Sequence, residues 1–162
     1  MITGNGRGFW WIPVSLLLAM ILSVVPVPAG MDDFRPQWVT LAVIFWCLTR
    51  PDRVGVFWAF WAGLILDTLT GSLLGQQALG LSVVAYLTAV MQSRLRLFPL
   101  WQQSVFVWVL LLVERLLTLW VLGATGQPVP PIGYWIPTLV GLLIWPLVAV
   151  LLTAIGRRTG TV

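Results

Sequence analysis

The stretch Gly63-Leu64-Ile65-Leu66-Asp67-Thr68-Leu69-Thr70-Gly71-Ser72-Leu73-Leu74-Gly75 places one carboxylate among apolar and small side chains. A carboxylate within lipid costs roughly 2.5–3.5 kcal/mol on insertion scales, so Asp67 is expected to face protein. Gly63, Asp67, Gly71 and Gly75 recur at every fourth position, which would place them on one face of a helix. Because small residues at this spacing allow helices to approach closely, we predict that this face contacts another helix, of this chain or of a partner.

The rest of the chain is similarly apolar. Of its 162 residues, 59% are hydrophobic and 9% are charged, whereas soluble domains carry about 25% charged residues. This composition predicts an all-α integral membrane protein in which residues 1–162 form a single transmembrane domain. All nine basic residues are arginine and they lie in alternate loops rather than in one patch, so binding to nucleic acid is not expected.

The composition also disfavours an enzyme. The chain has no histidine and one cysteine, Cys47, so it offers neither a His/Cys zinc cluster nor a Ser/His or Cys/His catalytic pair. Its five acidic residues are too scattered in the sequence to propose a metal site. We therefore predict no catalytic, cofactor-binding or metal-binding residues.

Six apolar segments are predicted to cross the membrane: 9–25, 36–49, 55–70, 75–91, 101–122 and 134–155. A spanning helix needs about 20 residues, and the second to fourth segments are short, which leaves a buried re-entrant pair as an alternative.

With the N-terminus in the cytoplasm, the positive-inside rule is obeyed by seven arginines: Arg7, Arg50, Arg53, Arg94, Arg96, Arg157 and Arg158. Both termini are therefore predicted to be cytoplasmic. The first segment loosely resembles a signal peptide, but its length and the prolines that follow it favour an uncleaved anchor.

Three ionisable residues fall within these segments: Asp67, Glu114 and Arg115. At 1.5 Å per residue, Asp67 lies about 18 Å along the third segment and Arg115 about 21 Å along the fifth. Both segments run outward, so the two residues are predicted to form a buried ion pair at matching depth. Glu114 has no assigned partner. Because all three residues cluster at one depth, structural contacts or a partner site are favoured over a proton or ion relay.

Several motifs resemble the rod shape-determining protein MreD family. They are Phe34-Arg35-Pro36-Gln37-Trp38, Arg50-Pro51-Asp52-Arg53-Val54-Gly55, the Gly63 to Gly75 block, Leu100-Trp101-Gln102-Gln103 and Leu143-Ile144-Trp145-Pro146. The likeness extends over nearly the whole chain, and the Gly63 to Gly75 block is its most specific part. The Glu114-Arg115 pair matches no motif of the family.

The resemblance implies a non-enzymatic protein of the bacterial inner (cytoplasmic) membrane that helps to organise peptidoglycan synthesis during cell elongation. It implies MreC as a direct partner within the membrane, and penicillin-binding protein 2, RodA and MreB as members of the same complex, all surrounded by membrane lipids. It also implies a fold like that of the substrate-binding membrane subunits of vitamin importers. A small-molecule-binding importer subunit therefore remains an alternative function, and it would need a pocket with convergent polar groups.

Overall fold

The computed structural model describes residues 10–159, and these contain six α-helices and two short 3-10 helices. The α-helices are α1 Trp11–Val24, α2 Trp38–Thr49, α3 Val56–Thr70, α4 Gln76–Leu95, α5 Leu100–Ala124 and α6 Ile136–Thr159, with η1 Asp32–Phe34 and η2 Ile132–Trp135 in the loops. Each of the six predicted apolar segments corresponds to one α-helix. Residue 9 of the first segment, and Arg7, lie outside the described residues.

Among residues 10–159, three helices are long and apolar enough to cross a membrane. They are α4 with 20 residues, α5 with 25, and the 27-residue stretch Ile132–Arg158, which covers η2 and α6 except for its last residue. The 14 residues of α1, 12 of α2 and 15 of α3 are fewer than the about 20 that a straight span needs. The structure thus establishes an all-helical fold with three candidate spans, and six crossings remain a prediction.

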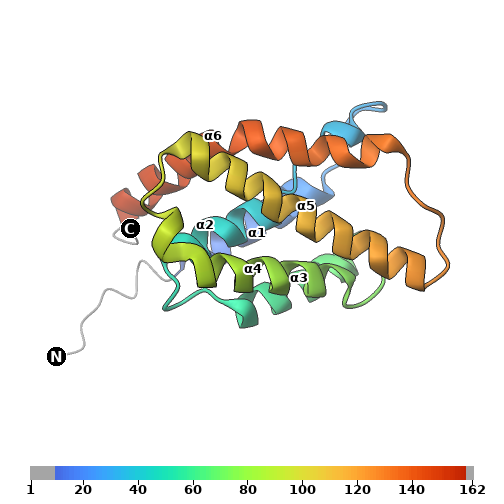
Figure 1. Cartoon of the computed structure of the whole chain (residues 1–162), viewed down its shortest axis with the longest axis horizontal. Coiled ribbons are helices and arrows are strands. Elements are labelled where there is room, and N and C mark those ends of the chain that lie inside the picture. Colours follow the sequence, from blue (N-terminus) through green and yellow to red (C-terminus); the bar gives the residue numbers. More distant parts are fainter. Residues whose placement is uncertain (1–9, 160–162) are drawn as a thin grey trace.

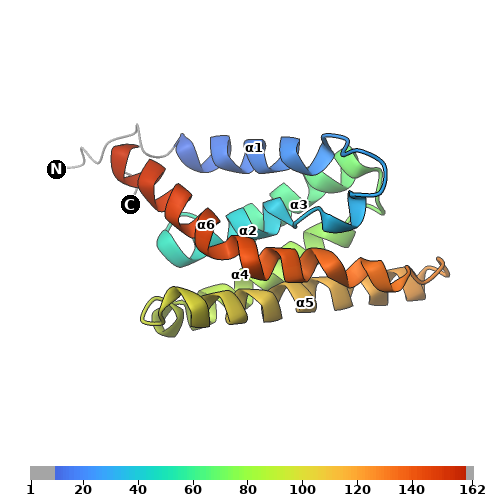
Figure 2. The same ribbon diagram turned by 90° about the horizontal axis from the view of Figure 1, so that it is seen from above.

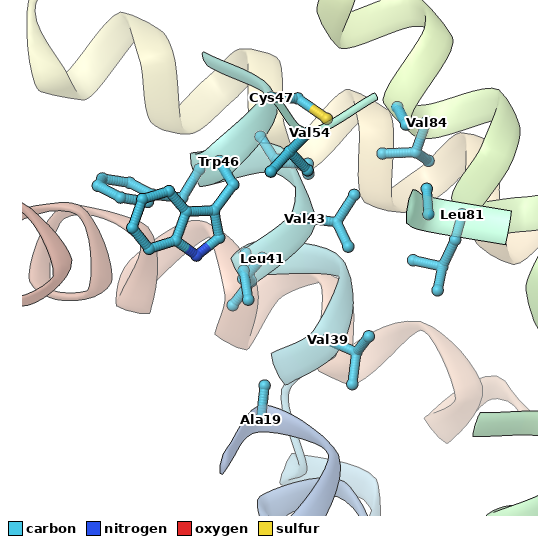
Figure 3. Close-up of a cluster of buried hydrophobic side chains, with 14 of the residues drawn as sticks. Ala19, Val39, Leu41, Val43, Trp46, Cys47, Val54, Leu81 and Val84 are labelled. Atoms are coloured by element: carbon cyan, nitrogen blue, oxygen red, sulfur yellow. The ribbon is translucent and has the colours of Figure 1, made fainter. Parts of the chain in front are cut away.

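Helix α2 forms the centre of the core. Ten of its 12 residues are buried, and α1, α4 and α6 all pack against it. In Figure 3, Val39, Leu41, Val43 and Trp46 of α2 point in different directions, toward helices on several sides. A helix that is apolar around its whole circumference is stable only when it is enclosed, and here the other helices of the chain enclose it.

The helices run roughly along one long axis, and the described start of α1 lies at the same end of the bundle as the end of α6 (Figures 1 and 2). Helices α2 and α4 also end there, so the arginines that follow them share that end with Arg157 and Arg158. Figure 2 shows that α6 bends along its length, as expected for a helix with Pro146 in its interior.

Candidate functional site

The Asp67 carboxylate caps the start of α4. It accepts hydrogen bonds from the Ser72 hydroxyl at 2.7 Å and from the backbone N–H groups of Gly75 at 2.8 Å, Gln77 at 2.9 Å and Ala78 at 3.5 Å. The first N–H groups of a helix have no partner within the helix, and the positive end of the helix dipole favours an anion there. Asp67 is completely buried, and its charge is balanced by backbone groups.

Gly63 lets α3 and α4 approach each other. A Cβ atom at this position would lie 2.3 Å from the Cα of Ala78 and 2.5 Å from its backbone nitrogen. Helix α3 ends at Thr70, however, and Gly71 and Gly75 belong to the turn before α4, with φ angles of 66° and 96°. The prediction that all four residues share one helical face is therefore wrong. Gly63 and Asp67 face α4 of the same chain, whereas the two other glycines allow the turn.

Glu114 is the second buried acid. Its Oε2 accepts hydrogen bonds from Gln37 Nε2 at 2.8 Å and from the Thr40 hydroxyl at 2.7 Å, so it joins α5 to the start of α2. Its side chain also lies over Gly80 of α4, where an added Cβ would be 3.0 Å from the Glu114 Cγ. One carboxylate thus contacts two other helices.

Arg115 does not pair with Asp67. Its guanidinium carbon lies 4.4 Å from the centre of the Tyr134 ring, and the Tyr134 hydroxyl donates to the Arg115 carbonyl oxygen at 3.2 Å. The carboxylate of Asp67 is already surrounded by four donors from the α3–α4 turn and α4. The predicted ion pair is wrong because matching depth does not fix the rotation of a helix about its axis. The hydrogen bonds of Asp67 are instead made by the adjacent turn and the start of α4.

The loop motif Phe34-Arg35-Pro36 connects α1 to this region. Arg35 donates to the Ser23 carbonyl oxygen at 2.6 Å and to that of Val25, so its charge lies at the negative end of the α1 dipole. Pro36 is buried and Phe34 is exposed. The next residue, Gln37, is one of the two that donate to Glu114.

These residues surround a cavity of about 160 Å³. Its lining includes Arg35, Gln37, Thr40, Glu114, Arg115 and Thr118. Three buried polar atoms of that lining have no hydrogen-bond partner among the described residues: Arg35 Nε, Gln37 Oε1 and Arg115 Nε. Two donors and one acceptor without partners make the cavity suited to water or to a small polar group. Among residues 10–159, no group of three or more acidic, histidine or cysteine residues could hold a metal ion.

Sequence reasoning missed the partners of Glu114. Gln37 and Thr40 are polar residues three positions apart at the start of an otherwise apolar segment, and this spacing places them on one helix face. That pattern indicates a polar contact, but it does not say which of the other helices supplies the acid. Nothing in the sequence indicated that Gly80 lies beneath Glu114, because this contact depends on how α5 crosses α4.

The fold and this site define an all-helical membrane protein whose buried polar groups join its own helices. The chain belongs to the rod shape-determining protein MreD family, whose family model matches residues 6–155. It is 32% identical over 153 residues to the rod shape-determining protein MreD of Haemophilus influenzae, covering 92% of this chain and 93% of that one. The resemblance inferred from the motifs is thus confirmed, and with it a role in determining rod shape. No solved structure matches the chain, so the expected likeness to vitamin-importer subunits gains no support.

Proposed function

We propose that this chain is a non-enzymatic scaffold of the bacterial inner membrane, working with MreC to organise peptidoglycan synthesis during elongation. The observation that carries the proposal is the family match over nearly the whole chain. The proposal includes six membrane crossings with both termini in the cytoplasm. It is supported by the arginines Arg50, Arg53, Arg94, Arg96, Arg157 and Arg158, which follow or end helices at one end of the bundle.

The contacts of the buried polar residues support a scaffold rather than an enzyme. Asp67 is surrounded by donors that hold the α3–α4 turn, and Glu114 is held by Gln37 and Thr40. The Ser72 and Thr40 hydroxyls donate to these acids, but both carboxylates are buried and the chain has no histidine that could complete a catalytic group. Their contacts fix how helices pack, which is what a protein needs in order to present a defined surface to partners.

Within this proposal, we assign the intramembrane contact with MreC to the groove between α1 and α3. The groove has a volume of about 610 Å³ and an almost wholly apolar lining of Leu17, Met20, Ile21, Val24, Val25, Pro26, Ile65 and Leu69. A single apolar helix suits such a groove, because bulky side chains can pack into it along its length. Helix α1 lies on the opposite side of the bundle from α5 (Figure 2), so α5 offers a control surface.

Complementation tests the proposal as a whole. The chain is expressed in a rod-shaped bacterium that lacks its own MreD, with cell shape and co-purification of MreC as readouts. We expect rods and retained MreC. Cells that stay round although the protein is abundant in the inner membrane would contradict the proposed function. Co-purification with an energising ATPase in place of MreC would indicate an importer subunit.

A matched pair of substitutions tests the groove. Ile65→Trp fills it, whereas Val109→Trp places the same side chain at a similarly exposed position on α5. We expect Ile65→Trp to reduce MreC recovery at least fivefold with the protein still in the membrane, and Val109→Trp to leave it unchanged. Equal recovery in the two variants would move the MreC contact elsewhere on the surface without affecting the complementation result.

A further inference from the structure

A cavity larger than the one beside Glu114 lies at the arginine-bearing end of the bundle. It has a volume of about 570 Å³ and is lined by Phe45, Leu48, Thr49, Arg96, Leu100, Gln103, Trp145, Ala149, Val150, Thr153, Ala154 and Arg157. The cavity exists because α2 ends at Thr49 after only 12 residues, whereas α6 continues to Thr159. The end of α2 therefore leaves a space beside the last turns of α6 and the first turn of α5.

The two charged residues of this lining are both arginines. Arg96 is fixed in place, since its guanidinium donates to the carbonyl oxygens of Leu48 and Thr49 at the end of α2. Arg157 approaches from α6 and is exposed. Helix α5 begins at Leu100, which brings the positive end of its dipole to the same cavity. Since no acidic residue lines it, the cavity has an electrostatic preference for an anion.

The remaining lining offers few free polar groups and is mostly apolar. Gln103, the amide of the lining, is occupied by the protein: it donates to the Leu95 carbonyl oxygen at 3.3 Å and accepts from Trp145 Nε1 at 3.1 Å. The walls are otherwise mostly apolar, and Leu100 and Val150 are about half exposed on the outer surface of the helices. An apolar surface that continues outward from a basic cavity matches an acyl chain attached to an anionic headgroup.

We propose that this cavity binds an anionic glycerophospholipid, with the lipid phosphate between Arg96 and Arg157 and an acyl chain along Leu100 and Val150. Basic pockets between helices at the cytoplasmic side of a membrane bind headgroups of this class. The volume lies within the range of about 300–1,000 Å³ that is usual for small-molecule sites. The proposal rests on the proposed orientation for the choice of leaflet, and it does not depend on MreC.

Native mass spectrometry of the purified full-length chain tests the site, using phosphatidylglycerol and phosphatidylcholine with identical acyl chains as probes. We expect the protein to retain phosphatidylglycerol preferentially. Arg157→Gln should weaken its binding about fivefold, the effect of one basic residue near an anionic surface. The matched control is Arg158→Gln, which removes the same charge from the adjacent residue that does not line the cavity. It should change the binding less than twofold.

A variant without a charge change completes the test. Ala154→Trp places an indole at the exposed rim of the cavity, so it should reduce phosphatidylglycerol retention while the elution volume of the protein stays the same. Equal retention of both lipids, equal effects of Arg157→Gln and Arg158→Gln, or full retention by Ala154→Trp would each overturn the proposal. Loss of MreC co-purification with intact lipid selectivity would contradict the proposed function and leave this site standing.

Discussion

Asp67 and Glu114 are both buried carboxylates toward the same end of the bundle, yet their partners differ in sequence distance. The groups that bind Asp67 lie 5 to 11 residues further along the chain, in the turn and first residues of α4. The side chains that bind Glu114 lie 74 and 77 residues before it, at the start of α2. One acid therefore closes a hairpin, and the other joins elements that meet only in the assembled bundle.

The difference in locality indicates different tasks. The Asp67 contacts require only α3 and α4, so they can form as soon as these two helices pack together. The Glu114 contacts require α2 and α5, with α4 beneath them at Gly80. Glu114 also borders the cavity that contains three unpartnered polar atoms. We infer that Asp67 stabilises the hairpin of α3 and α4. Glu114 instead lies beside an incompletely filled cavity, where the packing between helices is less tightly fixed.

Gly63→Leu should have the largest effect on the hairpin. A side chain at this position meets the backbone of Ala78 at 2.3 Å, and backbone cannot move aside as a flexible side chain can. Overpacking commonly costs about 1–3 kcal/mol, and we expect the upper end or more here. The measurement is the yield of monodisperse protein after heating in detergent. Gly123→Leu is the control, because nothing lies within 4 Å of its added Cβ. Equal yields for the two variants would show that the helices do not meet at Gly63.

Asp67→Ala should follow, because it leaves buried N–H groups of α4 without an acceptor. Each such group costs about 1–3 kcal/mol, so we expect a loss of about 2–4 kcal/mol, read as a lower thermal midpoint in detergent. Asp67→Asn keeps one acceptor oxygen and should lose less.

Adding Arg115→Ala distinguishes a local cap from an ion pair. If Asp67 acts through α4, the double variant should lose the sum of the two single losses, as independent sites do. A double variant more stable than Asp67→Ala alone would instead support the Asp67–Arg115 ion pair that was predicted from matching depth.

Glu114→Ala should have a smaller effect than Asp67→Ala. It removes one acceptor from Gln37 and Thr40 and leaves a space over Gly80, and the adjacent cavity can supply water to the freed groups. We expect a loss of about 1–2 kcal/mol in the same thermal assay. Glu114→Gln keeps the side-chain shape and an acceptor oxygen, so it should lose about half as much. A loss of stability larger than that of Asp67→Ala would contradict the conclusion that Asp67 contributes more to the stability of the bundle than Glu114 does.

The sequence predicted the class of the fold and the positions of the helices because apolar runs, arginines, glycines and prolines act locally. The gap between the predicted segments 55–70 and 75–91, for example, coincides with the turn between α3 and α4. It did not predict that α2 is enclosed on all sides, because a short apolar segment looks the same whether lipid or protein surrounds it. The length of the predicted segment 36–49 was the one hint, since it is shorter than the about 20 residues that a straight span through lipid needs.

The candidate site was predicted only in part. That Asp67 faces protein followed from the cost of a carboxylate in lipid, but its partner did not, because depth along two helices leaves their rotation undetermined. The partners of Glu114 depend on helix crossings between segments more than 70 residues apart. Contacts of that kind are set by packing of the whole bundle, and one sequence does not contain a local pattern for them.

Gly71→Ala should have an effect no larger than that of Glu114→Ala, and it separates backbone conformation from packing within the hairpin. Gly71 ends α3 with a φ of 66°, and nothing lies within 4 Å of an added Cβ, so the substitution brings strain without a clash. A left-handed residue other than glycine costs about 1–2 kcal/mol, and asparagine tolerates this conformation better than alanine. We therefore expect Gly71→Ala to lower the thermal midpoint slightly and Gly71→Asn to lower it less. Gly55→Ala is the control, because its φ of −144° is open to any residue and its Cβ is also free of contacts. If Gly71→Ala were as damaging as Gly63→Leu, Gly71 would be in contact with another helix or another chain, and the single glycine face proposed from the sequence would have to be reconsidered.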